Sequence, residues 1–404
     1  MAFQIDTASI HSASMRLEVI GNNISNSNTS GFKGSDFSDV LATSMSGAIG
    51  ASKAGTRQSF TQGNITASSN PLDMAINGNG FFRIECSGIA RYTRNGQFSL
   101  DKDGWIVNST GDRLSGYTVD TNGKIMTGAP VALKINPDPY LPKATENATL
   151  NLTLDVRKDP IVLADTPFVP GDPTTYTHST TTTVYDASGG AHDVQTFYVK
   201  RDATNWDVYA SVDGTLTPAV VAPAAATKVG ALEFDSSGVL TTASAKTAAA
   251  TSIAVSSTRN VAFDMSSAVQ FGTSFAASMD QDGSAPGQMT GYKIGVDGII
   301  TASYSNGRSI NMGQVILASF RNADGLTPTE NNEWMETSAS GPAALNTAGA
   351  GGLGSLEASA TEDANIDLTA EMIKMISAQR VFQAAAEMVK KQDQIMQTVV
   401  NIGQ

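Results

Sequence analysis

The sequence contains very little cysteine and histidine. Cys86 is its single cysteine among 404 residues, so no intrachain disulfide can form, and a zinc site built from several cysteines is excluded. We expect Cys86 to be a buried thiol on a strand, because a reactive thiol needs a cationic neighbour. The three histidines lack the spacing of a metal motif: His11, His178 and His192. The composition therefore predicts no metal site and no cofactor.

Charged side chains are also scarce. Asp, Glu, Lys and Arg make up 16% of the residues, against about 25% in an average protein. With 26 basic and 38 acidic residues the net charge is −12, which argues against a nucleic-acid partner. No apolar run approaches the roughly 18 residues that cross a bilayer, which predicts no membrane insertion. Residues 1–20 include Asp6 and Glu18 and lack the pattern of a cleaved secretory signal peptide.

Sequence motifs of catalysis are missing too. No Gly-x-Ser-x-Gly elbow is present to expose a nucleophilic serine. The glycine-rich stretch 77–80 is followed by Phe81 and Phe82 rather than by the lysine and helix of a phosphate-binding loop, so it predicts a tight turn. Residues 101–104 and 280–283 begin like calcium loops but lack the ligand series that ends in glutamate, and we expect turns there. We predict that the chain is not an enzyme.

The sequence does have an apolar stripe at each end. Near the N-terminus, apolar residues recur at the spacing of one helix face: Phe3, Ile10, Ala13, Leu17, Ile20 and Ile24. The same spacing near the C-terminus selects Leu368, Met375, Ala378, Phe382, Ala385, Val389, Met396 and Val399, and this stripe is widened by Val381, Met388 and Ile395. The pattern predicts a helix over about 365–402, and Glu362, Asp363 and Asp367 are placed to favour its N-terminal dipole.

Two long amphipathic helices need a partner that covers their apolar stripes, because helices in proteins are stabilised mostly by packing. One interpretation is that the two terminal helices pack on each other within one subunit. A second interpretation adds neighbouring copies of the chain, which cover the rest of the stripes. The sequence leaves both interpretations open, and it predicts that a solitary subunit has incompletely covered ends.

The chain between the ends has the pattern of short strands and turns. In residues 72–84, apolar positions alternate on both sides of the 77–80 turn, which predicts a hairpin. A second β stretch covers about 145–284. Its strand-like runs are 180–185, 194–200, 206–212 and 231–234. Its Ala, Thr and Ser-rich pieces at 220–227 and 241–257 carry little charge and predict exposed loops or peripheral strands.

These patterns predict a mainly β fold with α-helical termini, built from nested and discontinuous domains. The turn-rich style that precedes residue 145 returns after Gly287, so the simplest account is that one β domain is inserted into another. The predicted domains are a helical coiled-coil core of residues 1–30 with 366–404, an extended connector of 31–71 with 355–365, an inner β domain of 72–144 with 285–354, and an outer inserted β domain of 145–284.

One run of residues resembles a known signature. Residues 21–33 are similar to the motif shared by the axial proteins of the bacterial flagellum, and the matching positions are Gly21, Asn22, Asn23, Ile24, Asn26, Gly31, Phe32 and Lys33. Further blocks of that family resemble residues 72–82, 92–98, 365–368, 371–373 and 378–382. The length and the 145–284 insertion resemble the hook branch of the family rather than its shorter rod proteins. The family often has Tyr and Asn where this sequence has Phe382 and Ala385, so interhelical hydrogen bonds of those groups are absent here.

The resemblance implies a structural subunit that polymerises into the flagellar hook, a flexible tube that passes motor torque from the rod to the filament. It implies an inner tube of terminal helices with β domains outside, and export by the flagellar type III apparatus to an extracellular position without a cleaved signal. The implied partners are many copies of the chain, the distal rod, the hook cap and the hook–filament junction proteins. The alternatives are a distal-rod type of axial protein and, as a different class, a secreted β-rich adhesin or binding module.

Overall fold

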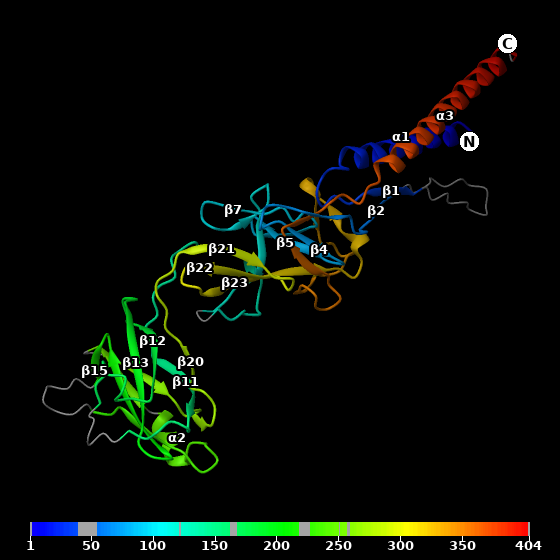
Figure 1. Ribbon diagram of the computed structural model, residues 1–404. Coiled ribbons are helices and arrows are strands. Elements are labelled where there is room, and N and C mark those ends of the chain that lie inside the picture. The colour runs from blue at the N-terminus through cyan, green and yellow to red at the C-terminus, as the bar shows by residue number, and fades with distance from the viewer. Residues whose placement is uncertain are drawn as a thin grey trace. The chain divides into compact units, whose positions relative to one another are not determined.

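The computed structural model of the chain describes residues 2–38, 55–120, 123–161, 168–217, 227–249, 251–256 and 259–402. Contacts divide the chain into two compact units. The first unit comprises residues 1–137, 290–303 and 309–404, and the second comprises 138–289 and 304–308. Strands predominate in both units, and the first and last elements of the first unit are helices that lie side by side (Figure 1). The predicted fold class, mainly β with α-helical termini, is confirmed.

Both predicted terminal helices are present (Figure 1). Helix α1 spans Ala2–Ser25 and helix α3 spans Leu368–Ile402. The side chain of Asp367 caps α3, since its carboxylate oxygen Oδ1 accepts the backbone N–H groups of Thr369 at 2.9 Å and Ala370 at 3.2 Å. This cap satisfies donors that have no partner within the helix, and it fixes the residue at which α3 begins.

Twelve described strands form one sheet of the first unit. The strand β23 (Ser309–Ser319) pairs with β22, β9, β5 and β26, so it joins segments that lie far apart in the sequence. The other strands are β5 (Phe81–Cys86), β6 (Ile89–Thr93), β7 (Ser99–Leu100), β8 (Ile106–Val107), β9 (Arg113–Tyr117), β10 (Val131–Ala132), β21 (Met289–Ile294), β22 (Ile299–Tyr304), β24 (Thr327–Pro328), β25 (Glu333–Met335) and β26 (Ala344–Thr347). Two short 3-10 helices are η1 (Ala323–Gly325) and η2 (Glu330–Asn332).

Three small two-stranded sheets complete the described part of the first unit. They pair β1 (Ser35–Ser38) with β2 (Gly55–Gln58), β3 (Ile65–Ala67) with β28 (Ala360–Glu362), and β4 (Met74–Asn77) with β27 (Ser355–Ala358). In two of these sheets, a strand that follows α1 in the chain pairs with a strand that precedes α3. The segments next to the two terminal helices are therefore held together by backbone hydrogen bonds.

The hairpin predicted around residues 77–80 is wrong. Strand β4 before this stretch pairs with β27, and β5 after it pairs with β6, β9 and β23. Gly78 and Gly80 have φ angles of 118° and 132°, far from the left-handed values of a tight hairpin turn. Both glycine carbonyls accept hydrogen bonds from the guanidinium of Arg94, at 2.9 and 2.8 Å. Hydrogen bonds from Arg94, which lies later in the sequence, therefore determine the conformation of residues 77–80.

The two aspartate-rich stretches differ from each other. Residues 101–104 form the predicted turn between β7 and β8, in which the Asp101 carboxylate accepts the N–H groups of Asp103 and Trp105. In the stretch 280–283, the first two residues end strand β20 (Ala276–Gln281), so a turn over the whole stretch is wrong. Pairing of β20 with β11 extends the strand to that point.

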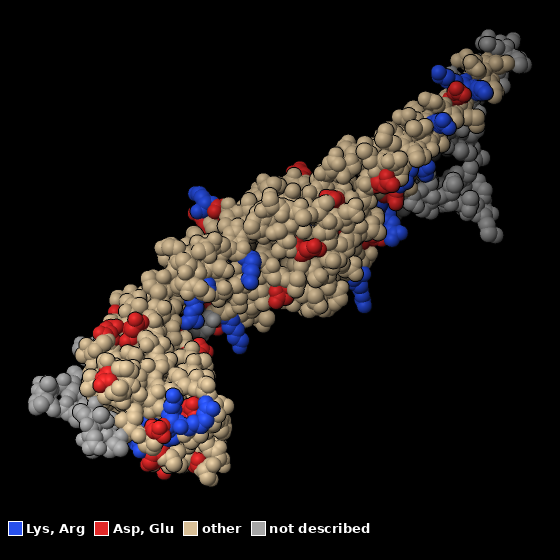
Figure 2. Space-filling view, in the orientation of Figure 1, with Lys and Arg blue, Asp and Glu red and all other residues tan. Residues whose placement is uncertain are grey.

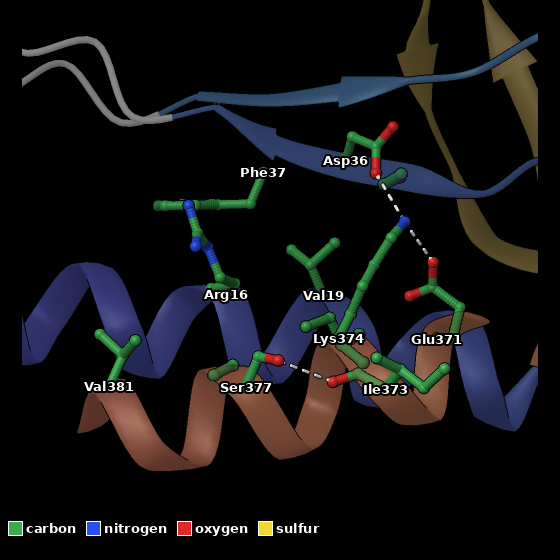
Figure 3. A pocket seen from close by; sticks show the side chains of 12 residues that line it. Arg16, Val19, Asp36, Phe37, Glu371, Ile373, Lys374, Ser377 and Val381 are labelled. Carbon is green, nitrogen blue, oxygen red and sulfur yellow. Dashed lines mark hydrogen bonds and ion pairs between the residues drawn. The ribbon is translucent and has the colours of Figure 1, made fainter. Parts of the chain in front are cut away.

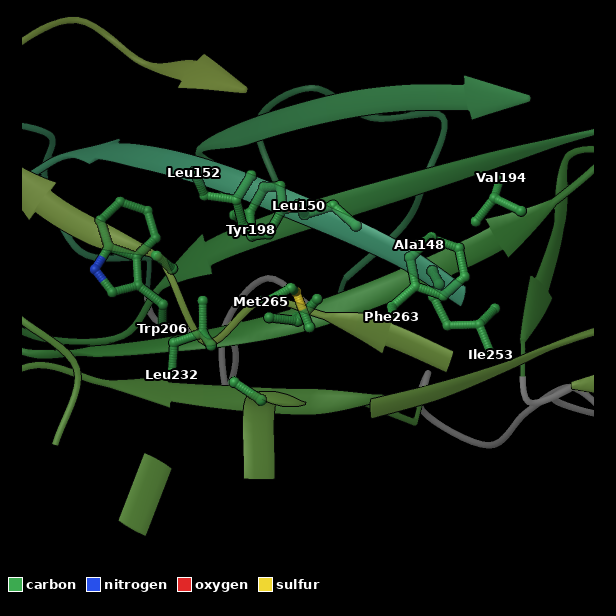
Figure 4. Close-up of a cluster of buried hydrophobic side chains, with 14 of the residues drawn as sticks. Ala148, Leu150, Leu152, Val194, Tyr198, Trp206, Leu232, Ile253, Phe263 and Met265 are labelled. Atoms are coloured by element: carbon green, nitrogen blue, oxygen red, sulfur yellow. The ribbon is translucent and has the colours of Figure 1, made fainter. Parts of the chain in front are cut away.

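The second unit is built on two five-stranded sheets. One contains β12 (His178–Tyr185), β13 (Ala191–Lys200), β14 (Asn205–Val212), β15 (Thr215–Thr217) and β16 (Gly230–Glu233), which confirms the four predicted runs. The other contains β11 (Asn147–Asp155), β17 (Thr251–Ser256), β18 (Arg259–Asp264), β19 (Val269–Phe271) and β20. Side chains of both sheets share one apolar core, shown in Figure 4. The fully buried Trp206 donates its indole N–H to Gln270 at 2.9 Å.

In the low-complexity stretch 241–257, the prediction of exposed loops or peripheral strands is wrong for residues 242–249, which form a helix, and is confirmed for β17, which lies at the edge of its sheet. Helix α2 spans Thr242–Ala249 and precedes β17. Ala248 and Ser244 are buried, and the Ser244 hydroxyl accepts the backbone N–H of Glu233 at 2.8 Å. Alanine has the highest helix propensity, and small side chains let this face lie close to strand β16. The other low-complexity stretch, 220–227, lies outside the described residues except for its last residue.

Candidate assembly interface

The two terminal helices pack against each other along part of their apolar stripes. They run antiparallel: Asn23 near the end of α1 donates to Glu371 near the start of α3, at 3.4 Å. Buried or half-buried stripe positions are Ile10, Ala13, Leu17, Ile20, Ile24, Met375, Ala378, Phe382, Ala385 and Val389. Leu368 is exposed. The side chains of Phe3, Met396 and Val399 lie outside the described residues. Contact within one subunit therefore covers only one face of α3.

A second apolar surface of α3 is exposed. Its members are Met372 (54% exposed), Ile373 (61%), Ile376 (52%), Val381 (53%), Met388 (61%) and Ile395 (59%). Val381, Met388 and Ile395 follow each other at intervals of seven residues, and they form a ridge that lies about 100° around the helix from the contact with α1. Met372, Ile373 and Ile376 form a separate patch near the start of the helix, which we call the first-turns patch. Exposed apolar surface of this kind marks an interaction site.

The two helices also differ in length. Helix α3 has 35 residues and α1 has 24, a difference of 11 residues, or about 16 Å at 1.5 Å per residue. In Figure 1 the end of α3 continues past the start of α1. The last turns of α3 therefore have no α1 turns beside them. Helical segments without tertiary packing are marginally stable in water, so these turns need another partner.

A groove of about 340 Å³ lies where α1, α3 and β1 meet (Figure 3). Its apolar lining comprises Val19, Ile20, Phe37, Ile373, Ala378 and Val381. On its polar side, the Lys374 ammonium lies 2.6 Å from a carboxylate oxygen of Glu371 and 3.5 Å from one of Asp36. The hydrogen bond to Glu371 raises the pKa of Lys374. The groove thus combines a charged rim with apolar walls, and its edge contains one ridge residue.

Several motif residues of the stretch 21–33 are not part of the apolar stripes of the two helices. They make other contacts next to the helix pair. Asn23 is buried, and its side chain accepts the N–H of Ser35 at 3.0 Å and donates to the carbonyl of Ser35 at 2.8 Å. The side chain of Asn26 donates to the carbonyl of Asn22 at 3.0 Å, which helps to end α1. The two hydrogen bonds between Asn23 and Ser35 hold strand β1 against α1. Phe32 is also buried.

Lys33 is the one charged residue of the stretch 21–33, and it is buried. The side chains of Lys33 and Glu362 are both 0% exposed, and Nζ lies 2.6 Å from the Glu362 oxygen Oε1. The guanidinium of Arg94, 4% exposed, lies 3.2 Å from the other Glu362 oxygen. Burial lowers the pKa of both Lys33 and Arg94, and Glu362 opposes that shift. Two cations therefore share one buried carboxylate, and we call these three residues the charge triad.

Backbone groups surround the charge triad. Glu362 accepts the N–H of Gly63 on its carboxylate at 2.9 Å and the N–H of Gly31 on its carbonyl at 2.7 Å. Gly31 has a left-handed φ of 71°, and an added Cβ would lie 2.3 Å from the backbone nitrogen of Asn95. Only glycine fits this position, because the two backbones touch there. The motif glycine is explained by this contact with the residue that follows Arg94.

Sequence reasoning missed the partners of this motif. Glu362 was assigned to the dipole of the C-terminal helix, which is wrong, because it ends strand β28 and is buried in the charge triad. Glu371, on α3, is buried and binds Asn23 and Lys374. The sequence feature that points to these partners is the small set of charged residues within the family's motif blocks, because the chain has few charges elsewhere.

Other sequence expectations concern reactive groups. Cys86 is not buried as predicted but half-exposed, because it is the last residue of β5. A hydrogen bond to the carboxylate of Asp112 raises the pKa of its thiol. Among the described residues, no group of three or more His, Cys, Asp or Glu side chains is placed to hold a metal ion. No described helix is long and apolar enough to cross a membrane.

The surface shown in Figure 2 carries few charges. Basic and acidic side chains are scattered over it, and most of the face is uncharged. The described chain therefore combines a weakly charged β surface with helices that expose apolar side chains. These features define a class of protein: a mainly β subunit whose two terminal helices pack on each other and leave apolar side chains of α3 exposed.

Comparisons with known proteins identify the member of that class. The family model described as flagella basal body rod protein matches residues 12–33, and the flagellar hook protein FlgE/F/G D1 domain matches residues 75–151. The flagellar basal body protein FlaE D2 domain matches residues 149–284, and the flagellar basal body rod FlgEFG protein C-terminal model matches residues 357–402. These matches include the N-terminal motif, the triad residues Arg94 and Glu362, and the second unit.

Relatives match over the whole length. The flagellar hook proteins FlgE of Salmonella typhimurium and Escherichia coli K12 are each 37% identical to this chain, over 409 and 410 residues, and the matches cover 100% of both chains. FlgE of Borreliella burgdorferi is 29% identical over 436 residues, 96% of each chain. The crystal structure of Helicobacter pylori flagellar hook protein FlgE2 shares the fold, with a TM-score of 0.54, 12% identity and coverage of 72% of this chain and 99% of that one. The chain belongs to the flagellar hook protein FlgE family, and it is a structural subunit of the flagellar hook.

Proposed function

We propose that the chain polymerises through its terminal helices, and that neighbouring copies cover the ridge and the first-turns patch of α3. The observation that carries this proposal is the exposure of six large apolar side chains on a helix that packs on α1 with a different face. Full burial of one such side chain contributes about 1.5 to 3 kcal/mol, and association costs about 4 to 15 kcal/mol. Several of these contacts per subunit are enough to offset the cost.

The arrangement of these surfaces favours an open polymer. The ridge and the contact with α1 lie on different faces of α3, and in this proposal the ridge of one copy packs against a different surface of the next copy rather than against a second ridge. Contacts between unlike surfaces propagate from copy to copy and produce a helix instead of a closed dimer. In this proposal residues 1–30 with 366–404 form the inner tube, and the β domains of 72–144 with 285–354 and of 145–284 lie outside it, joined by a connector of 31–71 with 355–365.

The other proposed partners are proteins that bind the ends of such a tube. We propose that its first copies bind the distal rod, that its growing end binds the hook cap, and that its last copies bind the hook–filament junction proteins. The chain reaches this extracellular position through the flagellar type III apparatus without a cleaved signal peptide. Its role is structural and not catalytic, in keeping with a sequence that has no arranged nucleophile and base. Weakly charged β surfaces let neighbouring copies slide as the hook bends, because few ion pairs must break.

A truncation series tests the proposal. We expect purified full-length chain to form filaments above a threshold concentration, visible by negative-stain electron microscopy. Removal of residues 1–30 or of 366–404 is expected to abolish them, while circular dichroism still shows folded β units. Filaments from a chain that lacks both ends would contradict the proposal, because they would place the contacts on the β domains.

Neighbouring residues of α3 offer a sharper test. Met388 is exposed on the ridge, and Val389 is half-buried on the face that meets α1. Met388→Glu is expected to abolish filaments with little change in monomer stability, because Met388 is 61% exposed in the single subunit. Val389→Glu, like Leu17→Glu, is expected to disturb the helix pair itself and to abolish filaments as well. Gln383→Glu on the exposed polar face is the matched control, and it should assemble normally. Normal tubes from Met388→Glu would exclude the ridge.

A further inference from the structure

The charge triad connects three separate segments of the first unit. Lys33 follows α1, Arg94 follows β6 in the large sheet, and Glu362 ends β28 shortly before α3. Glu362 therefore lies where the exit from α1, the entry to α3 and the sheet meet. Its backbone carbonyl and its carboxylate also hold the amides of Gly31 and Gly63. Glu362 thus contacts three segments of this joint: the one that contains Gly31 and Lys33, the one that contains Gly63, and the one that contains Arg94.

Other contacts of the joint depend on the same geometry. The Lys33 ammonium also donates to the carbonyl of Thr61 at 2.6 Å. Close by, the side-chain oxygen of Asn365 accepts the N–H of Gly34 at 2.8 Å, and its amide group donates to the carbonyl of Ser59 at 2.8 Å. The segments on both sides of the helix pair are therefore linked through side chains as well as through β3 and β28. Such a joint has little freedom to bend while the triad is closed.

We propose that Lys33, Glu362 and Arg94 form a latch that fixes the terminal helices to the β part of the first unit, so that load on the helices passes to the sheet through a closed joint. Its mechanical part rests on the proposed function, because load reaches the helices only in a polymer. The latch itself is a property of the single chain. When it opens, α1 and α3 come loose from the sheet while the β strands of both units stay folded.

The expected effect of each substitution in the charge triad depends on which buried charges it leaves without a partner of opposite sign. Removal of Glu362 leaves two buried cations without a counter-ion, and breaking a buried pair in this way is strongly destabilising. Removal of the Lys33 charge as well relieves most of that penalty, because two neutral amides can bond to each other and Arg94 keeps the carbonyls of Gly78 and Gly80. A charge swap of Lys33 and Glu362 does not help, because the new lysine at position 362 would face Arg94. These opposite expectations separate a three-residue latch from a simple ion pair.

Hydrogen exchange of the full-length chain, kept below its assembly threshold, tests the latch. In Glu362→Gln we expect exchange of peptides that contain Gly31 and Gly63 to accelerate by about 100-fold, with strand β23 unchanged. Lys33→Gln combined with Glu362→Gln should bring exchange back to within about tenfold of the unsubstituted chain, and the swap Lys33→Glu with Glu362→Lys should not. Asp324→Asn, which removes an exposed pair with Arg57, is the control and should leave these peptides unchanged.

Two results would overturn the latch. The first is unchanged exchange at Gly31 and Gly63 in Glu362→Gln. The second is acceleration that spreads equally through β23 and the second unit, which would make the triad a general stabiliser. For the mechanical part, electron microscopy of Glu362→Gln polymers should show tubes of altered curvature, and tubes of normal curvature would refute that part. Failure of the unsubstituted chain to assemble contradicts the proposed function and leaves the exchange result intact.

Discussion

Gly21 is a position at which one substitution is expected to stabilise the monomer and to weaken assembly of the polymer. It lies inside α1, and a Cβ added there would meet no atom within 4 Å. Glycine in a helix interior is less favourable than alanine by about 0.5 to 1 kcal/mol. We predict that Gly21→Ala stabilises the isolated chain by about that amount in urea unfolding. If a neighbouring helix passes close to Gly21 in the polymer, the same variant raises the threshold concentration for assembly. Loss of monomer stability would contradict this reading of the position.

A histidine of the second unit gives a pH dependence with a definite sign. His192 lies 2.7 Å from Asp213 and 3.6 Å from Asp186, and the hydrogen bond to Asp213 raises its pKa. Because the folded pKa exceeds the unfolded value of about 6.5, the stabilisation is fully present below that value and is lost as pH rises through the folded pKa. The group is partly exposed, so we expect less than about 1 kcal/mol.

The measurement is urea unfolding of the chain and of His192→Asn at pH 5.5 and pH 8.5. The variant should lose more stability at pH 5.5 than at pH 8.5. Comparison with the variant is needed because His178, whose pKa is lowered by burial, titrates with the opposite sign in the same unit. An equal loss of stability at both values of pH would show that the two aspartates do not bind the imidazolium.

At the scale of elements, the start of α3 depends on one side chain. Asp367 is the residue that caps the helix, and replacement of such a cap by alanine costs about 0.5 to 2 kcal/mol. We predict that Asp367→Ala weakens the first turns of α3 and raises hydrogen exchange there, while Asp363→Ala, outside the helix, does not. Since the first-turns patch includes Met372 and Ile376, assembly should also slow. Equal exchange in the two variants would argue against this cap.

Elements with a clear period were predictable from the sequence, and elements decided by distant partners were not. The stripes of α1 and α3 and the alternation of β12, β13 and β14 are local patterns, and the structure has these elements where the patterns indicate them. The 77–80 stretch reads locally as a turn, but Arg94 binds its carbonyls. Helix α2 has few apolar residues, so its burial against β16 left little periodicity to detect.

The candidate site was predictable only in part, for the same reason. The stripe positions that meet across the helix pair follow from spacing alone. Spacing does not show which stripe residues remain exposed, because exposure depends on the angle at which α1 crosses α3. The roles of Lys33 and Gly31 depend on Glu362 and Asn95, which lie in distant segments of the chain. No pattern in one sequence pairs residues over such separations.

At the scale of the whole molecule, the scarcity of charge has a consequence for bending. In the proposed function neighbouring subunits change their spacing as the hook bends, and weakly charged surfaces contain few ion pairs that must break. We predict that a variant with several Lys and Glu pairs added on exposed β faces forms stiffer tubes with altered curvature and supports less motility. Electron microscopy and swimming assays measure both effects, and unchanged curvature together with normal motility would count against the idea.

In the proposed polymer, the faces of α3 that a single copy leaves exposed hold the copies together. An electron cryo-microscopy reconstruction of the assembled polymer tests this most directly. We expect Val381, Met388 and Ile395 of each subunit to lie in contact with helices of neighbouring subunits, inside a tube whose β domains face outward. A tube in which the β domains make the contacts and the α3 ridges face solvent would contradict it.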